Sequence, residues 1–89
     1  MRKILENMAN DGKDCENFWK AKDRNDGCRV IPTGIGSDYV KFCPGEVPTF
    51  VEVKDGCHDI SPTQKDTRNI VTKMGFDYEV KRCSCEEGD

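Results

Sequence analysis

Six cysteines in a chain of 89 residues constrain this fold more than any other feature of the sequence. Two of them, Cys83 and Cys85, close a stretch in which Phe76, Tyr78 and Val80 alternate with charged residues. This alternation predicts a half-buried strand. Neighbouring cysteines on one strand point the same way and make a poor disulfide with each other. We therefore expect each of them to bond to a different, earlier cysteine.

The composition gives the disulfides a large share of the stability. Only 35% of the residues are hydrophobic and 35% are charged, so the core of so short a chain is thin. An even number of cysteines in a small polar chain is typical of secreted domains held together by disulfides. We expect a secreted, extracellular protein with three disulfides formed by Cys15, Cys28, Cys43, Cys57, Cys83 and Cys85. The first residues lack the apolar core of a signal peptide, so either Met1 is an addition to a mature chain or the protein is not secreted, and we expect the first.

The pattern along the chain predicts a small, disulfide-rich, mainly antiparallel β domain. We expect a flexible or frayed N-terminal tail over 1–14 and a single stapled domain over 15–89. Turn residues and apolar alternation place strands near 29–32, 38–43, 47–54 and 76–83.

The stretch 62–74 has two interpretations. Ser61 and Gln64 form a capping-box pattern with Pro62 at the first helical position, and Gly75 is suited to end a helix. Several β-branched residues in the same stretch disfavour a helix. A short helix and a long β arm both remain open.

The end of the chain resembles the cystine-knot growth-factor superfamily. The stretch from Val71 to Cys85 is similar to the closing strand of glycoprotein-hormone α-type and norrin-like chains, and the cysteine spacing is similar to that of neurotrophins. The resemblance implies a knot in which Cys28–Cys83 and Cys43–Cys85 form a ring that Cys15–Cys57 crosses. It also implies an extracellular signalling ligand or antagonist. The chain lacks the Cys-x-Gly-x-Cys of most such families, since no cysteine follows Gly45 closely.

A second resemblance covers Tyr39 to Cys57. This stretch is similar to the central piece of peritrophin-type chitin-binding modules, which implies carbohydrate binding through exposed aromatic side chains. The terminal Cys83-Ser-Cys85 does not fit that family, so carbohydrate binding is the third function considered.

Metal, cofactor and catalytic patterns are weak. The cysteines lack the Cys-x2-4-Cys pairs of zinc sites, and we expect no metal and no cofactor. His58 is the single histidine and is interpreted as a loop residue, so we expect no enzyme. The net charge of −3 with mixed signs gives no indication of nucleic-acid binding or membrane insertion.

Surface recognition is therefore the expected function. Large side chains and two loops provide the candidate contacts with a partner, because so small a core cannot hide them all. These residues are Phe18, Trp19, Ile31, Pro32, Ile35 and Tyr39. The partner is expected to be an extracellular protein: a receptor for a signalling ligand, or a host protease, cytokine or complement component for an inhibitor of the venom, salivary or parasite type.

Overall fold

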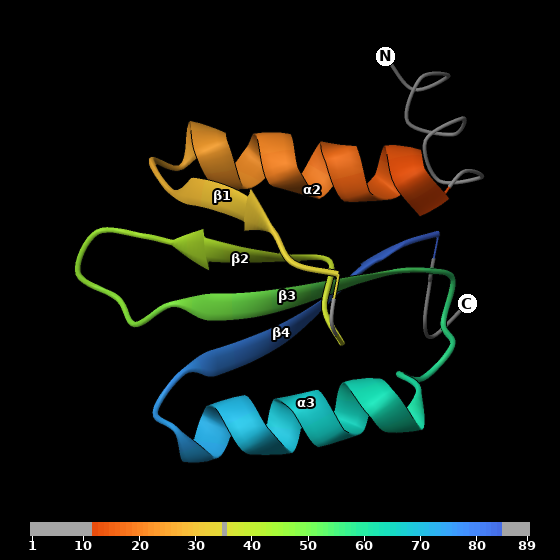
Figure 1. The fold of residues 1–89 in the computed structure, drawn as a ribbon. Helices are drawn as coiled ribbons and strands as arrows, with labels where there is room; N and C mark the ends of the chain where they lie inside the picture. Colours follow the sequence, from red (N-terminus) through yellow and green to blue (C-terminus); the bar gives the residue numbers. More distant parts are fainter. Residues whose placement is uncertain (1–11, 35, 85–89) are drawn as a thin grey trace.

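A computed structural model describes residues 12–34 and 36–84, which form two helices and a four-stranded sheet (Figure 1). Along the chain the elements are α2 (Gly12–Asn25), β1 (Arg29–Pro32), β2 (Tyr39–Phe42), β3 (Thr49–Asp55), α3 (Pro62–Lys73) and β4 (Asp77–Cys83). The strands lie in the order β1-β2-β3-β4, with α2 above the sheet and α3 below it in Figure 1. No described helix is long and apolar enough to cross a membrane.

The sheet is mixed rather than mainly antiparallel. β1 pairs with β2 and β2 with β3 in antiparallel register, but β3 and β4 run parallel. Parallel neighbours need a crossover connection, which is usually a helix. α3 is that crossover, so the expectation of antiparallel strands fails for β4.

The buried core lies mainly between the sheet and α2. Tyr39 of β2 is paired with Val51 of β3, and both side chains are fully buried together with Cys15 of α2. Thr49 and Val51 point to this same face, as strand alternation requires. We call it the α2 face.

The opposite face of the sheet, the α3 face, is only partly covered. Val71 of α3 is buried there, and the rings of Phe50 and Phe76 lie 5.9 Å apart. The loop between β1 and β2 closes against the same region, because the Tyr78 hydroxyl donates to the Gly36 carbonyl at 2.7 Å. A Cβ on Gly36 would lie 1.8 Å from Thr67 Oγ1, so this approach requires glycine.

The helix interpretation of 62–74 is confirmed. Ser61 is the N-cap of α3, and both bonds of the capping box with Gln64 are present. Gly75 follows the helix with φ of 95°, a backbone conformation that glycine adopts without strain.

α2 is the element that the sequence pattern does not predict. It begins at Gly12, so residues 12–14 of the predicted tail are helical, and residues 1–11 lie outside the described residues. Cys15, Trp19 and Asp23 follow each other at helical spacing and face the sheet. Asp23 is buried although it is charged, so the apolar stripe of an ordinary amphipathic helix is interrupted.

Two disulfides join described residues. Cys15 of α2 bonds to Cys83 at the end of β4, and Cys28 bonds to Cys43 across the β1–β2 hairpin. The pairing implied by the knot resemblance is therefore wrong, because Cys83 does not bond to Cys28 and Cys15 does not bond to Cys57. Cys85 lies outside the described residues.

The two disulfides should differ in their contribution to stability. Cys15–Cys83 spans 68 positions and Cys28–Cys43 spans 15. The chain-entropy model gives about 4 kcal/mol for the long loop and about 3 kcal/mol for the short one. We predict that replacing Cys15 and Cys83 by Ser lowers the free energy of unfolding in urea more than replacing Cys28 and Cys43. The reverse order would contradict the prediction.

Candidate functional site

The predicted partner contacts do not form one surface. Tyr39 is fully buried and is a core residue, which is a correction to the sequence analysis. Phe18 and Trp19 are half-buried on α2 and pack edge to face, with ring centroids 5.4 Å apart. Ile31 and Pro32 are exposed on β1 at the opposite edge of the sheet from β4, and Ile35 lies outside the described residues.

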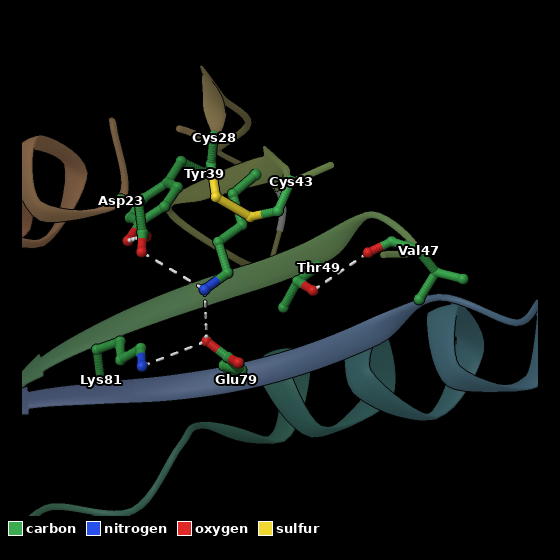
Figure 2. Close-up of a disulfide and its surroundings, with 9 residues drawn as sticks. Asp23, Cys28, Tyr39, Cys43, Val47, Thr49, Glu79 and Lys81 are labelled. Atoms are coloured by element: carbon green, nitrogen blue, oxygen red, sulfur yellow. Dashed lines mark hydrogen bonds and ion pairs between the residues drawn. A yellow bond between two sulfur atoms is a disulfide. The ribbon is translucent and has the colours of Figure 1, made fainter. Parts of the chain in front are cut away.

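A buried polar network lies beneath α2 (Figure 2). The Tyr39 hydroxyl donates to Asp23 Oδ2 at 2.5 Å, and Lys41 Nζ lies 3.4 Å from Asp23 Oδ1 and 3.2 Å from Glu79 Oε1. Burial and this hydrogen bond to Asp23 raise the pKa of Tyr39. Every charge in the network has an opposite partner, so it joins α2 to the sheet as a structural element.

A second group of polar side chains gathers at one end of the sheet. Asp38 immediately precedes β2, Glu52 and Lys54 lie near the end of β3, and Gln64 is in the first turn of α3. The starts of α2 and α3 and the end of β3 all lie at this end of the sheet, on the right in Figure 1, with the two helices on opposite sides of the sheet. Glu52 and Lys54 are two positions apart in one strand, so both point to the α3 face. We call Asp38, Glu52, Lys54 and Gln64 the carboxylate site.

Each carboxylate of this site is anchored through one oxygen. The backbone N–H of Val53 donates to Asp38 Oδ2 at 2.7 Å, and Gln64 Nε2 donates to Glu52 Oε2 at 2.8 Å. Gln64 is itself oriented by the capping box, because its Oε1 accepts the Ser61 N–H at 2.7 Å. Asp38 Oδ1 and Glu52 Oε1 accept no hydrogen bond from the residues that the structure describes. Each carboxylate of the site is thus held in place by a hydrogen bond to one of its oxygens.

Burial makes the carboxyl groups of the site costly to ionise. Glu52 is only 5% exposed, and burial, followed by the charge of Asp38, raises its pKa to about 7. Burial also raises the pKa of Asp38, against the effect of the Val53 N–H. Burial and the charges of Glu52 and Asp38 raise the pKa of Tyr78 to about 12. Lys54 Nζ, 3.9 Å from Glu52 Oε2, offsets only part of this negative potential.

The donor set fits a hard, hydrated cation. Mg²⁺ prefers oxygen ligands, keeps several waters and is usually held by one or two carboxylates together with the phosphates of a substrate. No group of three or more His, Cys, Asp or Glu side chains that could hold a metal lies within 12–34 and 36–84. Two carboxylates, with water and substrate completing the coordination, are what the described residues offer.

An apolar groove occupies the uncovered half of the α3 face. It has a volume of about 470 Å³ and is lined by Thr33, Phe50, Thr67, Ile70 and Val71. Ile70 is 59% exposed on the helix side. On the sheet side, Ile31 and Phe42 are 50% and 41% exposed and point to the same face as Phe50. Large apolar side chains that stay exposed around a groove are typical of binding surfaces.

The comparisons with known proteins are negative. No family model, curated protein or solved structure matches the chain. The resemblance to cystine-knot growth factors is therefore unsupported, and the argument for function depends on the geometry of this chain.

The carboxylate site was not predicted from the sequence, because only the net charge of −3 and the mixed signs of the charged residues were considered there. One signal was present in Glu52-Val53-Lys54. In the predicted strand, Thr49 and Val51 point to one face. The acid Glu52 and the base Lys54 therefore share the opposite face. A buried acid beside a base on a strand end is a functional-site pattern once burial is known.

The raised pKa of Glu52 predicts a pH-dependent stability. Its pKa in the folded protein, about 7, lies above its ordinary value of 4.5, so the folded state holds the proton more tightly. The stabilisation is complete below pH 4.5 and is lost as the pH rises through 7. We predict that, with a chelator present, raising the pH from 5 to 8 lowers the free energy of unfolding of the wild type. The decrease should be about 1–3 kcal/mol larger than the decrease for Glu52→Gln. Urea unfolding measures this difference, and parallel pH profiles of the two proteins would contradict the prediction.

Proposed function

We propose that this protein is a divalent-metal-dependent phosphodiesterase whose catalytic residues are Asp38, Glu52 and Lys54. The observation that carries the proposal is the pair of carboxylates, each anchored through one oxygen, beside a lysine on the same face of β3. This differs from the expectation of a non-catalytic protein. The proposal of a catalytic site depends on contacts between residues that are distant in the sequence.

The charge distribution supports a metal ion with a phosphate substrate. Asp38 acts on Glu52 as a like charge in a buried place, and a divalent cation would relieve this repulsion. Lys20 of α2 and Lys54 of β3 are nearby cations for Asp38, whereas Glu16 of α2 is a nearby anion for both carboxyls. Carboxylates that hold a metal, flanked by cations that attract an anion, are suited to phosphoryl chemistry.

The proposed reaction is hydrolysis of a phosphodiester. A divalent metal held by Asp38 and Glu52 would polarise the phosphoryl group and supply an activated water as the nucleophile. In the proposed hydrolysis the water oxygen would attack phosphorus and lose its proton to solvent, while the bond to one bridging oxygen would break and the leaving alkoxide would gain a proton. Gln64 keeps Glu52 oriented, and the Lys54 ammonium would stabilise negative charge on the attacked phosphate.

Nucleic acid is the proposed substrate class, because it is the polymer that presents phosphodiesters in series. The net charge of −3 gives the domain no broad basic surface. Binding would therefore depend on the local cations and on the metal, and we expect weak affinity for nucleic acid in a chelator.

The hydrolytic proposal predicts metal-dependent cleavage of plasmid DNA, a single-stranded oligonucleotide or a nitrophenyl phosphodiester in Mg²⁺ or Mn²⁺. Asp38→Asn, Glu52→Gln and Lys54→Met should each lower the rate by about 100-fold or more. The matched controls are Glu46→Gln and Lys73→Met, which remove the same charges at exposed positions. We expect both controls to retain the activity.

Metal binding can be measured independently of the substrate. Mg²⁺ or Mn²⁺ should raise the midpoint of thermal unfolding by mass action, more at pH 8 than at pH 6, because the ion competes with the proton on Glu52. The shift should disappear in Asp38→Asn. Absence of both cleavage and the metal-dependent shift would refute the proposal.

A second function is favoured by the apolar groove. We propose it as a site for an apolar side chain of an extracellular protein, which keeps the expectation of a ligand, antagonist or inhibitor acting by recognition. Phe50 and Ile70 line the groove, and Ile31 and Phe42 add exposed apolar side chains on the same face of the sheet. Trp19, in contrast, lies under the Lys81 ammonium at 5.1 Å and acts as a cover for the α2 face.

The groove proposal predicts a separation of stability and binding. Ile31→Ser and Ile70→Ser should change the free energy of unfolding by less than about 1 kcal/mol, because both side chains are largely exposed. They should weaken binding to a partner isolated from displayed extracellular proteins by about tenfold or more. Val47→Ser, at a position 46% exposed in the connection between β2 and β3, is the control. Equal effects of all three variants would contradict the prediction.

We also propose an oxidising, extracellular environment and a third disulfide that uses the remaining cysteines. Two disulfides within so small a domain support this environment.

A further inference from the structure

The outer edge of β4 is an unpaired strand edge. The Asp77 N–H donates to the Pro48 carbonyl, and the Cys83 carbonyl accepts the Gly56 N–H. In the parallel register with β3, the odd-numbered residues of β4 thus direct their backbone groups to β3. Tyr78, Val80 and Arg82 direct theirs outward, and the described residues provide no backbone partner for them. Such an edge is a template for another strand.

The other edge of the sheet is a poor template. The Thr33 N–H donates to the Asp38 carbonyl, so in this antiparallel pair Arg29 and Ile31 face β2 while Val30 and Pro32 face outward. Pro32 has no N–H, which leaves Val30 as the one outward donor of β1. β4 has seven residues in unbroken register and contains no proline. An added strand therefore finds more hydrogen bonds at β4.

We propose that a second copy of the chain occupies this edge, with the two β4 strands antiparallel about a two-fold axis at Val80. Val80 would then pair with Val80 of the other copy, and Tyr78 with Arg82. Each of these residues directs both backbone groups outward, so all of them form hydrogen-bonded pairs in this register. An interface of this kind is self-complementary and closed, as two-fold dimers require.

Charge complementarity selects this partner and this register. With Val80 on the axis, Glu79 lies opposite Lys81 of the other copy, and Lys81 opposite Glu79. These are the non-hydrogen-bonded pairs, whose side chains approach most closely. Both side chains remain partly exposed, and within one chain they lie 3.4 Å apart on the α2 face. Moving the axis to Glu79 or to Lys81 would place that residue opposite its own copy, which like charges disfavour.

The dimer would join two four-stranded sheets into one continuous sheet, with both α2 helices on the same side. A single strand pair buries little surface, so we expect weak, concentration-dependent association. The carboxylate site lies on β2, β3 and α3, so this proposal is independent of the proposed function.

The first test is sedimentation of the wild type over a range of concentrations, with two charge variants. We expect the mass of two chains at high concentration for the wild type and a monomer for Glu79→Lys and for Lys81→Glu. An equimolar mixture of the two variants should recover the dimer, because each Lys then faces a Glu across the interface. A folding defect in either variant would not be repaired by mixing, which makes recovery the decisive outcome.

The second test uses the wild type alone. Amide hydrogen exchange of Tyr78, Val80 and Arg82 should slow by about tenfold or more as the concentration rises. The amides of Glu79 and Lys81, which bond to β3, should be protected at every concentration. A monomer at all concentrations, or a dimer whose concentration-dependent protection lies on β1 or around the apolar groove, would overturn the proposal.

Discussion

The parallel pairing of β3 with β4 is the constraint on which the rest of the structure depends. Two consecutive parallel strands cannot be joined by a tight turn, so the chain must cross a face of the sheet, and α3 is the result. The crossover places the capping box of α3 over Glu52. The hydrogen bond between Ser61 and Gln64 at the start of α3 thereby also orients the Gln64 side chain, which donates to Glu52.

The two faces of the sheet differ in their packing and in how their charged groups are paired. The α2 face holds the buried core and a network in which each charge is matched, so it favours a single rigid arrangement. The α3 face holds Glu52, whose ionisation is made costly by burial and by the charge of Asp38, and a groove that the protein does not fill. Polar groups on the first face stabilise the fold, whereas those on the second reduce its stability at neutral pH, as functional sites commonly do.

Local patterns in the sequence predict the strands and α3 well, because their signals lie within a few residues: the alternation around Val51 and Val80, and the Ser61–Gln64 capping box. Three features depend on contacts between distant residues and were not predictable in this way. α2 is hidden because its buried face includes Asp23, whose charge is tolerated only through Tyr39 and Lys41. The pairing of Cys83 with Cys15 depends on the position of α2. Predicting the carboxylate site requires knowing that Asp38 lies beside β3.

The disulfide between Cys15 and Cys83 has a mechanical consequence. It joins a residue near the start of α2 to the last residue of β4, so the helices and strands between them form one covalent ring. A pulling force applied at the two termini passes through the sulfur–sulfur bond and does not load the hydrogen bonds of the sheet. A single backbone cleavage inside the ring would likewise release no fragment. Under a pulling force, the segment between Cys15 and Cys83 therefore cannot be extended while the disulfide is intact.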